Sequence, residues 1–420
     1  MSSGAPTEIE LTDPSLVVLA GTSGSGKSTF AAAHFAATEV LASDRFRAMI
    51  TDDEGDQRVS GHAFELLHAV AEKRLLHGKL TVVDATNVER EPRRALVAIA
   101  RSQHLPVDAV VLDLPIEECI ARDAARPGRS VGERVVREQR AQLDESLRSL
   151  ASEGFRRVIR LEGARAIDAA RFVRRPLDCD RRELTGPFDL VGDVHGCLDE
   201  LEALLAALGY TPEGAHPDGR RLILLGDVVD RGPKIAGVLR LVMRAVRAHG
   251  ALCVIGNHEA KVLRWLDGGT PGKGRGLAAT IAELEREPEG FRREVQGFLR
   301  ALPDHLVLDG GALVAAHAGL IERLHGRTGK RVRAFCLYGD TTGETDAEGF
   351  PIRRDWAAGY AGSAAVVYGH TPVPAAEWRN GTICLDTGCV FGGRLTALRW
   401  PERELVAVPA TRAWFEYRSA

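Results

Sequence analysis

The chain has 420 residues, of which 45% are hydrophobic and 27% charged, and its formal net charge is -3. These values are typical of a globular protein with two or three domains, and they exclude a strongly basic chain that binds nucleic acid through its overall charge. The seven cysteines are odd in number and include no C-x-x-C pair. Neither a disulfide framework nor a zinc ribbon is therefore expected, and a reducing cytoplasm is the predicted setting.

The N-terminal segment MSSGAPTEIELTDP is polar and acidic. It lacks the basic and apolar regions of a signal peptide, and no later apolar run approaches the ~20 residues of a membrane span. We therefore expect no membrane partner.

Short apolar runs alternate with helical patterns in the first half of the chain. Strands are predicted at residues 16–20, 39–42, 80–83 and 107–112, and helices at residues 62–77 and 92–102. Strands that are apolar almost throughout suit a parallel sheet with helices on both faces. The alternation predicts a doubly wound α/β domain.

The sequence GTSGSGKS at residues 21–28 matches the phosphate-loop pattern G-x-x-x-x-G-K-[ST] between a predicted strand and a predicted helix. Its glycines let successive N–H groups point at phosphate oxygens, and the helix N-terminus adds partial positive charge. Lys27 is expected to reach the β- and γ-phosphates and Ser28 to bind Mg²⁺, which predicts ATP with Mg²⁺ as the ligand. The predicted ATP-binding residues are Gly21, Thr22, Ser23, Gly24, Ser25, Gly26, Lys27, Ser28 and Thr29.

Three further features near this loop each have two interpretations. Asp44 follows the second strand and either accepts the proton of an attacking hydroxyl or caps a helix. Asp84 closes the third strand and either supports Mg²⁺ through water or is a plain strand-end residue. Arg122 and Arg126, with Arg129 close by, form either a mobile lid over the triphosphate or a solvated basic helix end.

Periodicity breaks at residues 171–187, RFVRRPLDCDRRELTGP, a charged segment with two prolines. We interpret it as the domain boundary. The predicted organisation is a first domain at residues 1–174, a linker at 175–187 and a second domain at 188–420.

A second series of strands follows the boundary, and polar clusters end most of them. Strands are predicted at residues 188–191, 222–225, 252–255, 313–316 and 366–368, with further short strands near 382–385, 395–400 and 404–408. Residues 261–302 have a helical pattern that a glycine-rich segment at 268–276 interrupts.

The polar clusters carry the side chains of a metal site. They are Asp193 and His195, then Asp227, Asp230 and Arg231, then Asn257 and His258, and finally His317 and His370. Because strand ends in an α/β sheet converge on one edge, we expect these side chains to meet. Carboxylate, imidazole and amide ligands together suit Mn²⁺, Fe or Zn²⁺ better than an all-oxygen Ca²⁺ site.

This set of side chains predicts phosphoester hydrolysis with two cations ~3.5–4 Å apart. Asp227 is the best candidate for a carboxylate that bridges them, so that a shared water attacks phosphorus in line. Arg231 is expected to bind phosphate oxygens, and His258, oriented by Asp230, to protonate the leaving group. Asp386, in CLDTG, is either an anchor behind the ligands or a turn residue.

The motifs in this order resemble those of bacterial polynucleotide kinase-phosphatase, the end-healing enzyme of RNA repair. The residues that carry the resemblance are GTSGSGKST, ASDRFR, TVVDATN, the arginine-rich segment, GDVHGC, GDVVDRGP, GNHE, AAHAG and GHTP. The phosphoesterase motifs alone resemble the broad family of calcineurin-type phosphatases. The resemblance implies a P-loop kinase domain followed by an α/β calcineurin-like metallophosphoesterase domain.

The resemblance also implies functions and residue roles. The kinase would transfer the ATP γ-phosphate to a 5′-OH end of RNA or DNA, with Asp44 as general base, Arg47 near the acceptor phosphate, and Arg122 and Arg126 as the lid. The phosphatase would remove 2′,3′-cyclic, 2′- or 3′-phosphates with two Mn²⁺ or Ni²⁺ ions. The implied metal ligands are Asp193, His195, Asp227, Asn257, His317 and His370.

The sequence departs from this family at its C-terminal end. Longer members continue into a ligase-like adenylyltransferase domain, whereas this sequence ends at Ala420 and has no K-x-D-G motif. We therefore expect that the chain does not seal ends itself. Either a separate ligase or other repair protein is its partner, or the sequence is a truncated form of a longer protein.

Two other functions use the same motifs, because the motifs specify phosphate and not the acceptor. One is a metabolite kinase joined to a nucleotide or dinucleoside-polyphosphate phosphatase. The other is a phosphoprotein phosphatase with an ATP-binding regulatory domain.

Overall fold

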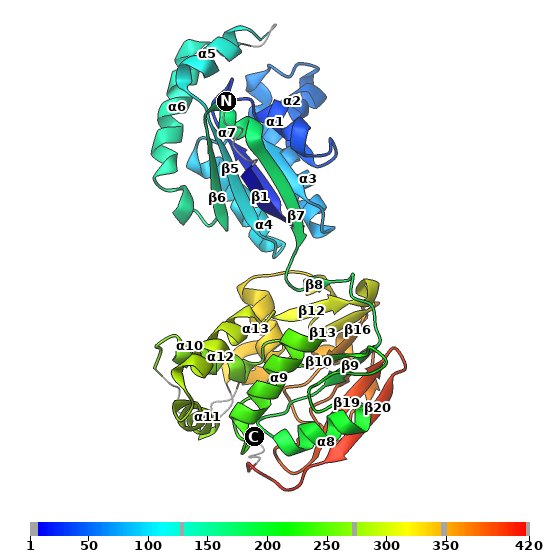
Figure 1. Ribbon diagram of the computed structural model, residues 1–420. Coiled ribbons are helices and arrows are strands. Elements are labelled where there is room, and N and C mark those ends of the chain that lie inside the picture. The colour runs from blue at the N-terminus through cyan, green and yellow to red at the C-terminus, as the bar shows by residue number, and fades with distance from the viewer. Residues whose placement is uncertain (1–6, 127–129, 271–274, 346–350, 417–420) are drawn as a thin grey trace. The chain divides into compact units, whose positions relative to one another are not determined.

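The computed structural model describes residues 7–126, 130–270, 275–345 and 351–416 (Figure 1). The chain divides into two compact units, which are Met1–Leu177 with Arg327–Gly329, and Asp178–Gly326 with Lys330–Ala420. Among the described residues, no helix has both the length and the apolar character needed to cross a bilayer.

The first unit alternates strands and helices. Its strands are β1 (Thr7–Asp13), β2 (Leu16–Ala20), β3 (Val40–Ala42), β4 (Thr81–Asp84), β5 (Val107–Asp113), β6 (Arg157–Glu162) and β7 (Ala170–Pro176). Its helices are α1 (Lys27–His34), α2 (Ser43–Thr51), α3 (Ser60–Leu76), α4 (Arg90–Ser102), α5 (Ile116–Ala124), α6 (Glu133–Leu147) and α7 (Gly163–Ala169).

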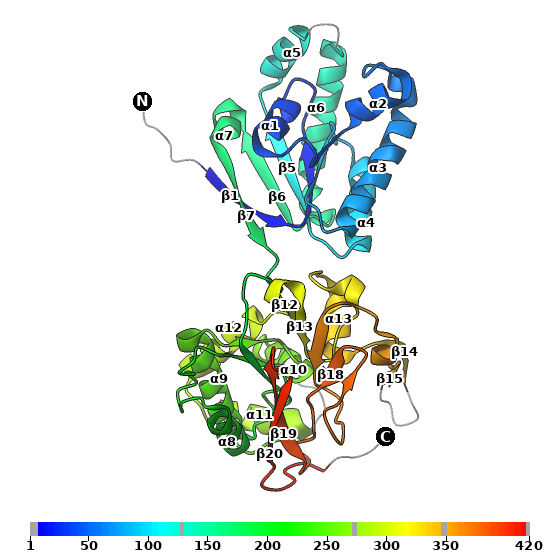
Figure 2. The ribbon, with the colours of Figure 1, turned by 90° about the vertical axis from the view of Figure 1, so that its right-hand side faces the viewer.

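The main sheet of this unit has the strand order β3-β4-β2-β5-β6, and every neighbouring pair is parallel. All residues of β2, β4 and β5 are buried. Because successive side chains point to opposite faces, burial of every residue requires helices on both faces, and these are visible in Figure 2. This confirms the predicted parallel α/β fold.

Part of the segment interpreted as a boundary is instead a strand. Strand β7 pairs in parallel with β1 from Thr7↔Ala170 to Asp13↔Pro176. Arg174, whose charge argued against a strand, forms an ion pair with Glu39 at 2.8 Å. Because the aliphatic part of an arginine can lie along a sheet while its charge stays outside, a charged sequence can form an edge strand.

The second unit is richer in strands. They are β8 (Asp180–Arg181), β9 (Phe188–Val191), β10 (Arg221–Leu224), β11 (Leu252–Cys253), β12 (His305–Leu308), β13 (Leu313–Ala316), β14 (Thr341–Thr345), β15 (Pro351–Arg353), β16 (Ala365–Tyr368), β17 (Trp378–Arg379), β18 (Thr382–Cys384), β19 (Arg394–Trp400) and β20 (Glu404–Pro409). The helices are α8 (Leu198–Leu208), α9 (Ile235–His249), α10 (Asn257–Leu266), α11 (Arg275–Glu285), α12 (Glu289–Ala301) and α13 (Lys330–Tyr338).

These strands form two larger sheets rather than the single sheet that the sequence suggested. Within the described residues, the strand orders are β11-β10-β9-β19-β20 and β17-β18-β16-β13-β12-β8. Apolar side chains from β9, β10 and β19 of one sheet pack against those of β12, β13, β16 and β18 of the other. Helices α8 to α12 pack on the outer face of the first sheet, and α13 packs beside β13 of the second. The strands that carry polar clusters are thus divided between two facing sheets.

The helical segment at residues 261–302 forms parts of α10, α11 and α12. Residues 271–274, within the predicted glycine-rich interruption, lie outside the described residues.

Candidate functional site

The phosphate loop of the first unit joins the end of β2 to the start of α1. Gly24 has φ +79°, and a Cβ atom there would lie 2.1 Å from the carbonyl oxygen of Cys119. Gly26 also has a left-handed backbone, with φ 90°, at the N-cap of α1. Side chains at these two positions are incompatible with the loop, which explains the glycines of the motif.

Lys27 is buried and bends back over the loop. Its Nζ donates to the carbonyl oxygens of Gly21 at 2.9 Å and Thr22 at 2.8 Å. Burial lowers the pKa of Lys27 to about 8, although the charge of Asp84 acts in the opposite direction. The loop therefore holds its own cation at the position where phosphate oxygens are expected.

The remaining loop residues differ in exposure. Ser28 and Thr29 are exposed in the first turn of α1, whereas Ser25 is buried inside the loop. Ser23 donates its backbone N–H to the Gln139 side-chain oxygen of α6 at 2.7 Å, a contact that the sequence did not indicate. A cavity of about 460 Å³, lined in part by Thr29, lies beside the loop.

Asp44 and Arg47 lie on one face of α2 and form an ion pair. Helix α2 begins at Ser43 with Ala42 as its N-cap, and no side chain caps it. Asp44 is therefore in the first turn and is not the cap, which leaves its other interpretation, a carboxylate beside the acceptor, as the remaining prediction.

Asp84 ends β4, and the strand register places it beside Leu19 of β2 and Ala42 of β3. Its charge raises the pKa of Lys27, after the larger opposing effect of burial. Three adjacent parallel strands therefore end side by side. Strand β4 ends at Asp84, β2 leads into the phosphate loop, and β3 leads into α2.

The predicted lid arginines lie at the end of α5. Arg122 is half-exposed and lies 3.6 Å from Glu118. A Cβ atom on Gly26 would lie 3.6 Å from Arg122 Nη1, so this side chain is next to the loop. Arg126 follows α5 and contributes, after burial and Asp84, to the pKa of Lys27. Arg129 lies outside the described residues.

In the second unit, the predicted ligands follow the carboxyl ends of strands from both sheets. Asp193 and His195 follow β9, Asp227 follows β10, Asn257 follows β11, His317 follows β13, His370 follows β16 and Asp386 follows β18. All of these side chains are buried except that of His370, which is partly exposed. The structure brings them together where the two sheets meet.

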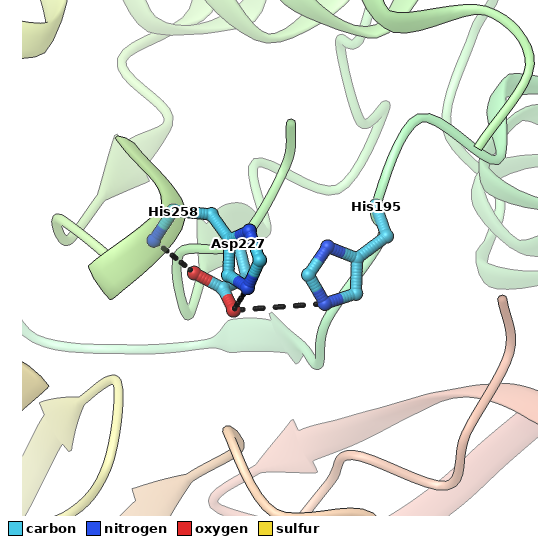
Figure 3. Close-up of side chains that lie close together, drawn as sticks. All are labelled: His195, Asp227 and His258. Atoms are coloured by element: carbon cyan, nitrogen blue, oxygen red, sulfur yellow. Dashed lines mark hydrogen bonds and ion pairs between the residues drawn. The ribbon is translucent and has the colours of Figure 1, made fainter. Parts of the chain in front are cut away.

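Asp227 lies at the centre of this cluster. Its Oδ2 is 3.6 Å from His195 Nε2, 3.8 Å from His258 Nε2 and 3.4 Å from His317 Nε2. Figure 3 shows one carboxylate oxygen of Asp227 in contact with the rings of both His195 and His258. Two groups of candidate metal ligands result, namely His195, Asp227 and His258, and Asp227, His317 and His370. Because both groups share Asp227, its carboxylate would be a common ligand if each group held a cation.

Backbone carbonyls orient two of the imidazoles. His195 Nδ1 lies 2.8 Å from the Val229 oxygen, and His317 Nδ1 lies 3.0 Å from the Leu225 oxygen. Because a carbonyl oxygen can only accept, each Nδ1 carries the proton and each Nε2 presents its lone pair toward Asp227.

Asn257 and His370 complete this side of the cluster. Asn257 Oδ1 lies 3.0 Å from His317 Nε2 and 3.0 Å from His370 Nδ1. The backbone N–H of His370 donates to both carboxylate oxygens of Asp193 at 3.1 Å.

The donor set fits divalent cations. Burial raises the pKa of Asp227 to about 7 and that of Asp386 to about 7. Burial, and then repulsion from Asp386 and Asp227, raises the pKa of Asp193 well above its ordinary value. Burial lowers the pKa of His317 to about 4, so this imidazole is neutral. Crowded buried carboxylates beside neutral imidazoles are stabilised by cations, as transition-metal sites require.

Several residues of the cluster have a left-handed backbone. The φ angles are 44° at His195, 48° at Asp227, 69° at Asp230, 69° at Arg231 and 76° at His370. Such conformations cost on the order of 1–3 kcal/mol each and persist only where the surrounding structure imposes them. The chain turns sharply after each strand and thereby directs these side chains inward.

His258, Asp230 and Arg231 lie together beside Asp227. His258 Nδ1 is 2.5 Å from Asp230 Oδ2, as the sequence predicted. Arg231 donates to His195 Nε2 at 2.6 Å and to His258 Nε2 at 3.1 Å. Burial, followed by the charge of Arg231, lowers the pKa of His258 well below its ordinary value. The imidazole is therefore neutral in this state.

Asp386 has features of both a turn residue and an anchor near the predicted ligands. Its Oδ1 accepts the backbone N–H of Gly388 at 3.0 Å, which is a turn contact. A Cβ atom on Gly369 would lie 2.0 Å from Asp193 Oδ1 and 3.7 Å from Asp386 Cβ, so Asp386 also lies near the predicted ligand Asp193. The charge of Asp386 contributes, after burial, to the raised pKa of Asp193.

Sequence reasoning assigned no role to Glu259, the last residue of GNHE. Its fully buried carboxylate accepts backbone N–H groups from Asp227 at 2.7 Å, Val228 at 2.9 Å, Val229 at 3.2 Å and Gly256 at 2.9 Å. This carboxylate fixes the loop that carries Asp227. Its position three residues after the N-cap of α10 was the available signal.

Two further contacts had no signal in the sequence. Thr280 of α11 donates its hydroxyl to Asp230 Oδ1. Arg353 of β15 donates to His370 Nε2 at 2.9 Å. Thr280 lies 50 residues and Arg353 17 residues from the side chain that it contacts, and both lie outside the motifs.

Comparison with protein families divides the chain in the same order. Residues 16–149 match the AAA domain family, in a kinase-like branch, and residues 186–391 match the calcineurin-like phosphoesterase family. These matches confirm the predicted fold class, a P-loop kinase-like domain followed by an α/β metallophosphoesterase domain.

Curated relatives match the phosphoesterase region. A bis(5′-nucleosyl)-tetraphosphatase PrpE (asymmetrical) of Anoxybacillus flavithermus is 44% identical over 231 residues, which cover 53% of this chain and 94% of that protein. The Bacillus subtilis protein of the same name is 44% identical over 238 residues, covering 55% and 98%. A crystal structure of a candidate diadenosine tetraphosphatase is 29% identical with a TM-score of 0.43, covering 55% of this chain and 96% of that one.

Proposed function

Because the chain belongs to the calcineurin-like phosphoesterase family, we propose that its second unit hydrolyses bis(5′-nucleosyl) tetraphosphates. The relatives that carry this name are covered almost completely, at 94% and 98% of their length. The observation that carries the proposal is the pair of ligand groups that share Asp227. This is the dinucleoside-polyphosphate alternative of the sequence analysis, and it replaces polynucleotide ends as the preferred substrate.

Different side chains of the cluster would have different roles in such a reaction. Cations held by the two groups would supply Lewis acidity and make water a better nucleophile. Arg231, whose guanidinium faces His195 and His258, would bind phosphate oxygens with its planar fork. Asp230 fixes Nδ1 of His258, so that Nε2 points toward Asp227 and would be a ligand of the first group.

For the first unit we propose ATP-dependent phosphoryl transfer. Lys27 and the loop N–H groups would bind the triphosphate, and Asp84 would support Mg²⁺ through water. Asp44 would accept the proton of the acceptor hydroxyl, and Arg122, which is next to the loop, would neutralise charge on the transferred phosphate.

Healing of 5′-OH and 3′-phosphate ends of RNA or DNA is the second candidate function. The Asp44–Arg47 ion pair on α2 favours it, because the family resemblance assigns these residues to the base and to the acceptor phosphate. The presence of a phosphoesterase in the same chain also supports it.

Hydrolysis assays on the full chain with Mn²⁺ discriminate between these functions. Bis(5′-adenosyl) tetraphosphate should yield ATP and AMP with kcat/KM at least ~100-fold above that for an RNA with a 2′,3′-cyclic phosphate. A preference for the RNA end would overturn the proposal in favour of end healing. Phosphate release from phosphopeptides alone would instead support the phosphoprotein phosphatase alternative.

The acceptor of the first unit is tested with γ-labelled ATP. Label transfer to a 5′-OH oligonucleotide, abolished by Asp44→Ala, would support a polynucleotide acceptor. Transfer to nucleosides or other metabolites but not to oligonucleotides would support a small-molecule acceptor. The Lys27→Ala variant serves as the control that removes ATP-dependent transfer to any acceptor.

A further inference from the structure

Arg231 has a second set of neighbours in addition to the histidines of the cluster. The guanidinium carbon lies 5.2 Å from the centre of the Phe391 ring and 6.0 Å from that of Phe415. The two rings are themselves 6.5 Å apart in an edge-to-face arrangement. The same guanidinium donates to His195 and His258. Arg231 therefore connects the candidate metal centre to an aromatic pair.

The two rings come from different parts of the chain. Phe391 lies in the loop that follows Asp386, and Phe415 lies in the segment after β20. The Val390 oxygen accepts the backbone N–H groups of Trp414 at 2.9 Å and Phe415 at 3.0 Å. These backbone contacts hold the second ring against the loop that carries the first.

Glu200 of α8 fixes the segment 411–416, which we name the C-terminal strap. Its buried Oε1 accepts the backbone N–H of Thr411 at 3.0 Å, the Thr411 hydroxyl at 2.7 Å and the Trp414 indole N–H at 3.3 Å. A single buried carboxylate oxygen thus serves three donors on a surface segment. The strap is held in place by specific contacts and does not merely lie on the surface.

We propose that Phe415 stacks on the base of a nucleoside whose phosphate is bound by Arg231, with the Phe391 ring edge-to-face beside it, so that the two rings form an aromatic platform. This inference rests on the proposed function and identifies the part of the site that recognises a nucleoside. A phosphate on the guanidinium of Arg231 would place its attached ribose next to both rings. Stacking on an aromatic side chain recognises any base, because every base has a π-face.

A simpler role for the rings is to orient Arg231 by cation–π contact and by packing against the apolar core, which both rings touch. The two roles differ in one measurable consequence. A platform affects only ligands that carry a base, whereas a support for Arg231 affects every phosphate ligand equally.

The test measures competitive inhibition constants against hydrolysis of p-nitrophenyl phosphate by the full chain with Mn²⁺. In Phe415→Leu and Phe391→Leu, the inhibition constant of AMP should rise about tenfold, while that of inorganic pyrophosphate should stay within twofold. Phe415→Tyr, which keeps the ring, should retain the AMP constant of the unchanged protein. Equal rises for both inhibitors, or no rise for AMP, would overturn the platform.

Phe291→Leu is the matched control. Phe291 of α12 also lies beneath an arginine, with Arg240 at 4.3 Å, but it belongs to the outer helices and not to the metal cluster. This variant loses the same atoms and the same kind of cation–π contact, so it should change neither inhibition constant.

Two measurements keep the proposal testable if the leucine variants fold poorly. In the unchanged protein, ribose 5-phosphate should inhibit about tenfold more weakly than AMP, because it lacks the base. Calorimetric titration of AMP and of ribose 5-phosphate into the Lys27→Ala chain should also show tighter binding of AMP, in the absence of substrate turnover. Equal inhibition by AMP and ribose 5-phosphate would overturn the platform.

Failure of the proposed function would give a different result. If bis(5′-adenosyl) tetraphosphate is not hydrolysed while AMP inhibition still depends on the two rings, the substrate assignment is wrong and the platform stands. If the tetraphosphate is hydrolysed and ring loss affects all phosphate ligands alike, the platform is wrong and the function stands.

Discussion

Lys27 and Asp227 are both buried ionisable residues near the carboxyl ends of parallel strands, yet their surroundings are opposite. Lys27 is held by carbonyl oxygens of its own loop, and burial lowers its pKa to about 8. Asp227 lies near other buried carboxyl groups, and burial raises its pKa to about 7. The first site offers positive charge to an arriving anion, whereas the second gathers buried acidic side chains whose ionised forms would be stabilised by cations.

The largest expected effect that tests the contrast between the Lys27 and Asp227 sites is a loss of phosphoesterase activity. We expect Asp227→Asn to reduce phosphoesterase kcat/KM by at least ~1000-fold, because both ligand groups lose their shared carboxylate. Transfer from γ-labelled ATP should remain unchanged. Loss of both activities in a variant with an unchanged circular dichroism spectrum would show that the two sites are not independent.

The reciprocal variant is Lys27→Ala. Removing the ammonium that we propose binds the triphosphate should lower ATP-dependent transfer by ~100- to 1000-fold. Hydrolysis of the tetraphosphate should stay within twofold. Lys79→Ala, an exposed lysine of the same unit, is the control and should leave transfer unaffected.

Removal of divalent ions should change the Tm of the second unit but not that of the first. Chelation is expected to lower the Tm of the second unit by about 5–10 °C, because a ligand that binds only the folded state stabilises it. The Tm of the first unit, measured in the same calorimetric scan, should not change. In the chelated protein, Asp386→Asn should raise the Tm of the second unit, because it removes one of the mutually repelling buried carboxylates. A lowered Tm in that variant would contradict the repulsion inferred here.

The smallest expected effect concerns Thr280, which donates to Asp230 behind His258. Thr280→Val keeps the shape and removes two hydrogen bonds, one donated to Asp230 Oδ1 and one accepted from the Asp230 backbone N–H. Each is worth about 1 kcal/mol, so kcat should fall about 3- to 30-fold. Thr280→Ser keeps the hydroxyl and should retain most of the activity. If the serine and valine variants lose equal activity, the hydroxyl is not what orients the His258–Asp230 pair.

The sequence predicted most strands of both units because each is a short apolar run followed by a polar cluster. It could not show that β9 and β13 belong to different sheets, since their apolar patterns are alike and only long-range pairing assigns them. It also missed β7, because the arginines of this strand resemble those of a solvated linker.

In the candidate site, too, the sequence predicted residues that belong to local motifs and missed those that depend on long-range contacts. The ligands lie within local motifs, so Asp227 and His317 could be named from the sequence before their proximity was known. Glu259 could be seen in GNHE, but its partners are backbone N–H groups about thirty residues away, and a backbone group leaves no mark on sequence. Phe415 had no signal, because its position beside Arg231 depends on the contacts of the C-terminal strap.

The parallel pairing of β1 with β7 determines where the chain enters and leaves the first unit. Parallel strands begin at the same end, so Thr7 lies beside Ala170, and the exit at Pro176 is at the far end of the ribbon, about 20 Å away. An affinity tag or reporter domain fused ahead of Thr7 would therefore emerge from the end opposite the exit. A domain fused there should therefore not contact the segment that follows Pro176.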